Sequence, residues 1–163
     1  MIGSHASRWW VAGVIALALG APAGAAAQSG SSGAVRKQVI QPEGFRPTPS
    51  PLSPAILVGD TLYLSGSTGG DPKTGALVAG GFEPEMRQIM ANVQTVLKAA
   101  GLSLADVVAV TAYLGDMSDY ARFNDIYREY FTAQPLPTRS TVAVKELARG
   151  ARIEMTMIAV RAK

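Results

Sequence analysis

The stretch VVAVTAYL, residues 107–114, decides the fold because it is apolar on both of its alternating faces. Successive side chains of a strand point to opposite sides of a sheet. One side would carry Val107, Ala109 and Tyr113, and the other Val108, Val110, Ala112 and Leu114. Such a pattern is typical of a strand that is buried on both sides. The sequence therefore predicts a central strand with protein packed against each face.

Two amphipathic helices are predicted, one before and one after this strand. The first ends at Gly101, and its apolar residues at helical spacing are Met86, Ile89, Met90, Val93, Val96, Leu97 and Ala100. The second has Ser118 or Asp119 as its N-cap, and its apolar residues are Tyr120, Phe123, Ile126, Tyr127, Tyr130 and Phe131. We interpret the methionines and aromatic residues as core filling, not as a ligand set or a base-stacking platform.

The remaining apolar segments are predicted to be strands. Ala55–Val58 and Thr61–Ser65 form a hairpin around Gly59-Asp60, and Ser140–Lys145 and Arg152–Arg161 complete the set. This order of elements predicts an α+β domain in which two helices cover one face of a single sheet. Two helices cannot cover both faces. The doubly apolar strand then needs a partner on its open face, and a symmetric homo-oligomer is the simplest one.

The N-terminal residues are typical of an export signal. Arg8 is followed by an apolar run from Trp9 to Leu19 and by the small residues Ala25–Ala27. We expect residues 1–27 to be a signal peptide that directs the protein out of the cytoplasm, to the periplasm in a bacterium. An uncleaved membrane anchor is the alternative, although the apolar run is short compared with the roughly 20 residues of a membrane span.

The residues after the signal are expected to form a linker and one domain. Residues 28–36 begin with a Ser- and Gly-rich run, which is typical of a flexible linker. Residues 37–163 have the length of one domain with a single core, and no internal repeat is visible.

The composition restricts the chemistry. The chain has no cysteine, and its single histidine is His5, within the expected signal peptide. The folded domain therefore lacks a cysteine nucleophile, a histidine base, and the nitrogen and sulfur ligands usual for zinc and copper. The formal net charge of +3 is small and the basic residues form no run, which argues against nucleic acid as a partner.

One arginine and one carboxylate remain as candidate catalytic residues. Arg139 lies in Pro137–Val142, and its planar guanidinium matches a carboxylate or a phosphate. Glu154 lies in the apolar run Ile153–Val160, where a carboxylate costs free energy unless it is paired or functional. We expect the last two strands to pair antiparallel and to bring Arg139 near Glu154. A structural ion pair between the two is the alternative.

An ordered series of motifs resembles the RidA family, also called YjgF and, by an older label, endoribonuclease L-PSP. The resemblance runs from about Gln38 to Arg161. Its motifs are Leu62–Gly66, Asp71–Gly75, Asn92-Val93, Ala99–Gly101, Asp106–Val108, Phe123–Tyr127, Pro137–Val142 and Ile153–Met155. The resemblance implies a chorismate-mutase-like α+β fold assembled as a homotrimer with clefts at the subunit interfaces. It also implies hydrolysis of reactive enamines and imines to 2-keto acids and ammonia, with no cofactor and no metal.

The resemblance assigns roles to particular residues. Arg139 matches the arginine that clamps the substrate carboxylate, and Glu154 the glutamate that positions or activates water. Ser65, Gly66, Asn124 and Thr141 match positions that line the cleft.

One cleft position departs from the pattern, because Leu52 stands where active relatives carry a tyrosine. This change replaces a hydroxyl by an apolar wall, which would favour a bulkier apolar imine or mark a member that binds without turnover. A non-catalytic small-molecule binder, or a chaperone-like trimer outside the cytoplasm, is therefore the alternative function. Ribonuclease activity, which the older label suggests, is disfavoured because the expected domain has no histidine and no basic stripe.

Overall fold

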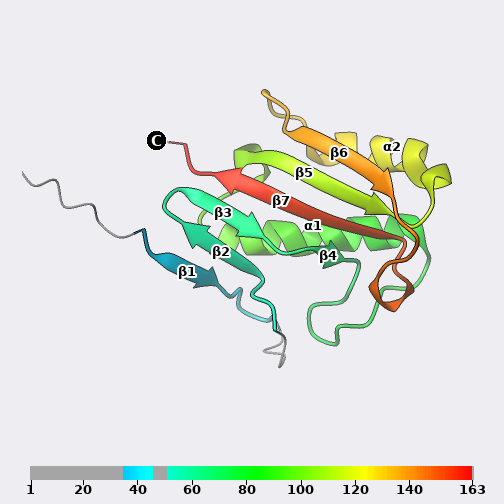
Figure 1. The fold of residues 1–163 in the computed structure, drawn as a ribbon, viewed down its shortest axis with the longest axis horizontal. Helices are drawn as coiled ribbons and strands as arrows, with labels where there is room; N and C mark the ends of the chain where they lie inside the picture. The colour runs from blue at the N-terminus through cyan, green and yellow to red at the C-terminus, as the bar shows by residue number, and fades with distance from the viewer. Residues whose placement is uncertain (1–34, 46–50, 163) are drawn as a thin grey trace, which may run out of the picture. The chain divides into compact units, whose positions relative to one another are not determined.

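A single mixed sheet with two helices on one face makes up the described part of the chain (Figure 1). The structure is a computed structural model and describes residues 35–45 and 51–162. The strands are β1 (Lys37–Ile40), β2 (Ala55–Val58), β3 (Thr61–Leu64), β4 (Ser67–Thr68), β5 (Val107–Leu114), β6 (Thr138–Ala143) and β7 (Ile153–Val160). The helices are α1 (Phe82–Ala99) and α2 (Tyr120–Tyr130). The expected signal peptide and residues 28–34 of the expected linker lie outside the described residues.

The order of the strands differs from the order in the sequence. Hydrogen-bonded neighbours follow the order β1-β2-β3-β7-β5-β6, and β4 pairs with β7 beyond the end of β3. The pair β5–β6 is parallel, and the other pairs are antiparallel. The expected antiparallel pairing of the last two strands is therefore wrong, because β5 lies between them. The expected α+β class with one sheet and two helices is confirmed.

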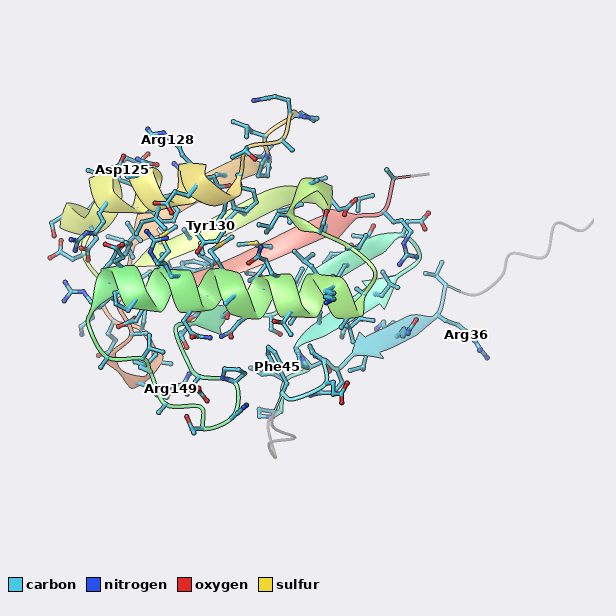
Figure 2. The ribbon with its side chains drawn as sticks, turned by 180° about the vertical axis from the view of Figure 1, so that it is seen from behind. Arg36, Phe45, Asp125, Arg128, Tyr130 and Arg149 are labelled. Atoms are coloured by element: carbon cyan, nitrogen blue, oxygen red, sulfur yellow. The ribbon has the colours of Figure 1, made fainter. Side chains whose placement is uncertain are left out.

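The core lies between the two helices and one face of the sheet. In Figure 2, seen from behind, α1 and α2 both lie in front of the sheet. Every second residue of β7, from Ile153 to Ala159, is buried against the helices, as are Met86 and Phe123 from α1 and α2. The methionines and aromatic residues thus fill the core as expected. Within the described ranges, no helix is both long and apolar enough to cross a membrane.

The central strand β5 departs from simple alternation. The register with β7 shifts between Val107 and Ala109, a β-bulge that turns Val107 to the helix side. Val107, Val110, Ala112 and Leu114 are consequently buried on one face, while Val108 is 45% exposed on the other. The predicted assignment of faces is thus wrong at Val107 and Val108. The prediction of burial on both sides does not hold for the single chain.

The ends of the helices follow from local chemistry. Gly101 follows α1 with a φ of 70°, and the Leu102 N–H donates to the Leu97 carbonyl at 2.8 Å, which closes the helix as predicted. At the start of α2 neither Ser118 nor Asp119 caps the helix through its side chain. Instead Asp116 accepts from the Ser118 N–H at 2.8 Å and caps a short 3₁₀ helix, Met117–Asp119, that leads into α2.

Gly101→Ala is expected to lower the free energy of unfolding by about 1 kcal/mol, because a left-handed backbone costs an L residue roughly 1–2 kcal/mol. Gly101→Asn should lower the free energy of unfolding by less than Gly101→Ala, since asparagine adopts the left-handed conformation more readily than alanine. Urea denaturation with an unchanged m-value measures both changes. Equal losses for the two variants would contradict a backbone origin.

Candidate functional site

The two predicted catalytic residues lie on opposite faces of the sheet. Arg139 on β6 is in register with Val110 of β5, whose side chain is buried under the helices. Glu154 on β7 is in register with Tyr113, on the face away from the helices. Residues in register across neighbouring strands share a face. The expectation that Arg139 and Glu154 meet within one chain, as a site or as an ion pair, is therefore wrong.

Helix α2 fixes the guanidinium of Arg139. Nη2 of Arg139 donates to Oδ1 of Asn124 at 2.6 Å. The Arg139 Cζ atom lies 4.7 Å from the ring centroid of Phe123 and 4.5 Å from that of Tyr127. These distances are within the range of cation–π attraction. Because residues one turn apart share a side of a helix, Phe123 and Tyr127 hold one face of the guanidinium and Asn124 holds one corner.

The remaining donors of Arg139 are available. A guanidinium has five N–H donors, and among the described residues only Asn124 accepts from that of Arg139. The side chain is half-buried at the edge strand of the sheet. Arg139 is thus a preset, partly desolvated cation with donors left for an anion. Bidentate pairing with a carboxylate is what this geometry suits best.

Two hydroxyl groups near Arg139 are buried without a hydrogen-bond partner among the described residues. They are Oγ1 of Thr141, two residues further along the same face of β6, and the hydroxyl of Tyr127. Burial raises the pKa of Tyr127 to about 12, and the nearby Arg139 charge only partly opposes that rise. A buried hydroxyl with no partner costs free energy, so both groups are suited to a water or a ligand atom.

Glu154 belongs to a second group of residues, around the break between β3 and β4. Its carboxylate lies so close to Gly66 that a Cβ at that position would overlap Oε1, so a larger residue there would displace the carboxylate. Ser65 donates two hydrogen bonds. Its N–H donates to the Pro54 carbonyl at 3.0 Å, and its Oγ donates to the Ser53 carbonyl at 2.6 Å. Among the described residues, the Glu154 carboxylate has no hydrogen-bond or ion-pair partner. This leaves it available to a water or a substrate.

The predicted site residues thus form two groups. Asn124, Arg139 and Thr141 make up the first, which we call the arginine group. The second, the glutamate group, comprises Leu52, Ser65, Gly66 and Glu154. Leu52, Ser65 and Gly66 line a cavity of about 520 Å³. No three His, Cys, Asp or Glu side chains of the described residues gather into a metal-binding cluster.

Sequence reasoning missed two contributions to these groups. The helical pattern of Phe123 and Tyr127 predicts only a core position, but their rings also contact the guanidinium of Arg139. Their helical spacing around Asn124 was the available signal. Arg149, which lines the cavity of the glutamate group, gave no signal beyond its position before a glycine.

Comparisons with known proteins agree with this architecture. The family model described as endoribonuclease L-PSP matches residues 45–161. A solved structure of RidA from the Antarctic bacterium Psychrobacter sp. superposes with a TM-score of 0.70 at 35% identity, over 76% of this chain and 99% of that one. Escherichia coli TdcF with bound serine superposes with a TM-score of 0.70 at 29% identity, over 77% and 99% of the two chains.

A curated relative carries the name of an enzyme. The 2-iminobutanoate/2-iminopropanoate deaminase of Bos taurus is 41% identical over 111 residues, which is 68% of this chain and 80% of the bovine protein. The fold is thus that of the solved RidA-type α+β proteins. The chain belongs to the endoribonuclease L-PSP family, the RidA family that its motifs resemble.

Tyr127 should ionise at a higher pH than an ordinary tyrosine. Its pKa is about 12 in the folded protein against an ordinary 10.0, so between these values the unfolded chain releases a proton that the folded chain retains. The free energy of unfolding then falls as the pH rises through that window. Ultraviolet titration should show one late tyrosine that Tyr127→Phe removes, together with part of the alkaline slope of stability. Ionisation of Tyr127 at the ordinary tyrosine pKa of 10.0 would contradict its burial.

Proposed function

We propose that the protein is an enamine/imine deaminase, a hydrolase that converts 2-imino and 2-enamino acids to 2-keto acids and ammonia. The observation that carries this proposal is the preset guanidinium of Arg139, which has free donors and lies on two aromatic rings. Such a group suits a substrate with a fixed carboxylate. The name of the bovine relative and the serine bound to TdcF support the same substrate class, since serine also carries a carboxylate.

The active assembly in this proposal is a homotrimer with clefts at the subunit interfaces. One chain holds the arginine group and the glutamate group on opposite faces, so a second copy must supply the missing group to each cleft. The open face of the sheet supports this assembly, because it exposes Tyr63, Val108 and Val142 at 49%, 45% and 46%. Apolar side chains gathered on one face favour burial against another protein surface. The arginine group lies at the edge strand β6, within reach of a neighbour.

The proposed reaction needs only a clamp, a water and a proton carrier. Arg139 holds the substrate carboxylate, which places the imine carbon beside Glu154 of the cleft. A water gives a proton to Glu154 while its oxygen bonds to that carbon, and the electron pair of the C=N bond moves to nitrogen. Glu154 passes the proton to nitrogen. The C–N bond of the resulting carbinolamine then breaks, its hydroxyl proton goes to the departing nitrogen, and the products are a 2-keto acid and ammonia.

Enamine substrates enter the same route after one proton transfer. Protonation at the enamine carbon gives the imine, and no oxidant or reductant takes part. The proposed reaction therefore requires two contributions from the protein. Arg139 stabilises the substrate carboxylate, and Glu154 stabilises the attacking water. No described feature favours RNA cleavage, since the described residues contain no histidine and the charge is scattered.

Arg139→Ala should lower kcat/KM by at least about 100-fold, because the substrate carboxylate loses its charged partner. Arg139→Lys should lower kcat/KM by at least about tenfold, since the positive charge remains but the planar pair of donors does not. Glu154→Gln should lower kcat/KM by about 100-fold or more, because the glutamine side chain cannot act as the base. The assay generates imino acids with an amino-acid oxidase and follows how far the protein reduces trapping of the imine by semicarbazide. Arg128→Ala, an exposed arginine on α2, is the matched control and should keep full activity.

The shared cleft has its own test. Co-expression of Arg139→Ala with Glu154→Gln should restore about one quarter of the activity, because a random mixture pairs the two intact groups at that fraction of interfaces. Arg139→Ala mixed with the Arg139→Ala/Glu154→Gln double variant should restore none. Absence of recovery in the first mixture would show that the groups do not meet across an interface. Absence of activity in the wild type would overturn the deaminase assignment itself.

We also propose that residues 1–27 direct export and are then removed, which places the domain in the periplasm of a bacterial host. The charged, apolar and small-residue regions of this segment support the proposal. Expression of the full chain should yield a periplasmic product whose mass corresponds to an N-terminus at Gln28. A full-length mass in the membrane fraction would instead support the uncleaved anchor.

A further inference from the structure

A cavity of about 520 Å³ lies beside the glutamate group, whose residues Leu52, Ser65 and Gly66 line it. It starts at Ser65 and Gly66, where the Glu154 carboxylate lies, and extends to the side of α1. Figure 2 shows Phe45 and Arg149, which both line it, on the same side of that helix. Its volume is within the roughly 300–1,000 Å³ of small-molecule sites. A methyl side chain, as on 2-iminopropanoate, would leave most of it unused.

The surface that the cavity offers is mainly apolar. Its walls include five large apolar side chains, namely Phe45, Leu52, Leu64, Val93 and Val96. Val93 and Val96 come from the buried side of α1, and Leu64 from the end of β3. Burial of an aliphatic or aromatic group against such walls stabilises a complex by about 0.8 kcal/mol for each methylene removed from water.

Two polar side chains of the lining, Asn92 and Asp71, hold the walls of the cavity. Asn92 is buried, donates to the Gly70 carbonyl at 2.8 Å and accepts from Gln88 at 2.9 Å. Asp71 accepts from the N–H groups of Lys73 and Thr74, both at 2.8 Å, within its own turn. These hydrogen bonds shape the loop that closes one side of the cavity.

Arg149 also helps to hold the walls. Its guanidinium donates to the Gly75 carbonyl and, at 2.9 Å, to Oγ1 of Thr68, so it joins the loop to β4. Its backbone has a φ of 62°, a left-handed conformation that is uncommon for a residue other than glycine. The charged residues of the lining are this one cation and Asp71, and their charges cancel. The lining therefore carries no net charge that would attract an anionic side chain.

We infer that this cavity receives the side chain of the substrate and selects imino acids whose side chain is neutral, apolar and branched or aromatic. The inference rests on the proposed function for the position of the substrate carboxylate and the imine carbon. With that carbon beside Glu154, the side chain is the part of the substrate that enters past Gly66. Leu52, at the position where the resemblance expects a tyrosine, adds an apolar wall at the same entrance.

Binding of 2-oxo acids, the products of the reaction, tests the cavity without requiring turnover. Calorimetry on the purified full chain compares pyruvate, 4-methyl-2-oxopentanoate and 2-oxoglutarate. The branched acid has three more carbons than pyruvate and should bind roughly 10- to 50-fold more tightly. 2-Oxoglutarate should bind no more tightly than pyruvate, because its second carboxylate meets a lining with no net positive charge. In the imine assay, the same order should appear in kcat/KM for the imines of leucine, alanine and glutamate.

Variants assign the preference to the cavity. Leu52→Ser and Phe45→Ala should each reduce the advantage of the branched acid over pyruvate several-fold. Leu52 is 68% exposed, so its substitution keeps the test available if Phe45→Ala fails to fold. Met117→Ser, which alters an exposed apolar residue outside the cavity, is the matched control.

The outcomes separate this inference from the proposed function. Hydrolysis that depends on Arg139 but is indifferent to the side chain would overturn the cavity assignment and leave the deaminase. Selective binding of the branched acid with no hydrolysis of any imine would support the cavity and overturn the deaminase. Tighter binding of 2-oxoglutarate would show that Arg149 binds a distal carboxylate, and failure of all three acids to bind would also overturn the assignment.

Discussion

The parallel pairing of β5 with β6 is the constraint on which the other features depend. Two parallel neighbours cannot be joined by a tight turn, so the chain must cross over the sheet between them. Helix α2 makes that crossing and therefore lies over the side chains of β6 that face the helices. This placement brings Phe123, Asn124 and Tyr127 onto Arg139. It also leaves β6 at the edge and sends β7 into the middle of the sheet.

The separation of the arginine and glutamate groups follows from the same arrangement. Side chains alternate along a strand, so Arg139 turns toward the helices when Val110 does, and Glu154 turns away when Met155 is buried. A charge on the helix face at the edge of the sheet is stabilised by aromatic rings and an amide. A charge on the open face is stabilised only by solvent or by another chain. The chain thus displays two reactive groups that it cannot combine by itself.

Much of the fold could be predicted from the sequence because its elements have strong local signals. The helical spacing of Met86 to Ala100, the stop at Gly101 and the apolar run of β5 each specify one element. Register and strand order are different, since they depend on contacts between distant segments. An antiparallel β6–β7 pair satisfied every local rule, yet β5 takes the place between them. The bulge at Val107 has no signal in an all-apolar stretch.

The sequence names candidate site residues, which stay a prediction, but it does not specify their geometry. The motif resemblance selected Arg139, Glu154, Ser65, Gly66, Asn124, Thr141 and Leu52. The structure brings these residues into two groups, each of which is locally coherent. In the proposed trimer the link between the groups belongs to the assembly, and a single sequence carries no direct record of it. The aromatic support of Arg139 was hidden because Phe123 and Tyr127 also satisfy the pattern of an ordinary helix core.

The placement of Arg139 and Glu154 on opposite faces has a kinetic consequence. In the proposed trimer, a solitary chain is folded yet inert, and chemistry begins only when three chains have met. At concentrations well below the assembly constant, the rate would grow with the cube of the chain concentration instead of linearly. Newly synthesised protein would therefore be inactive at low concentration, and its activity would rise steeply as it accumulates. Dilution alone would extinguish it, with every chain still intact.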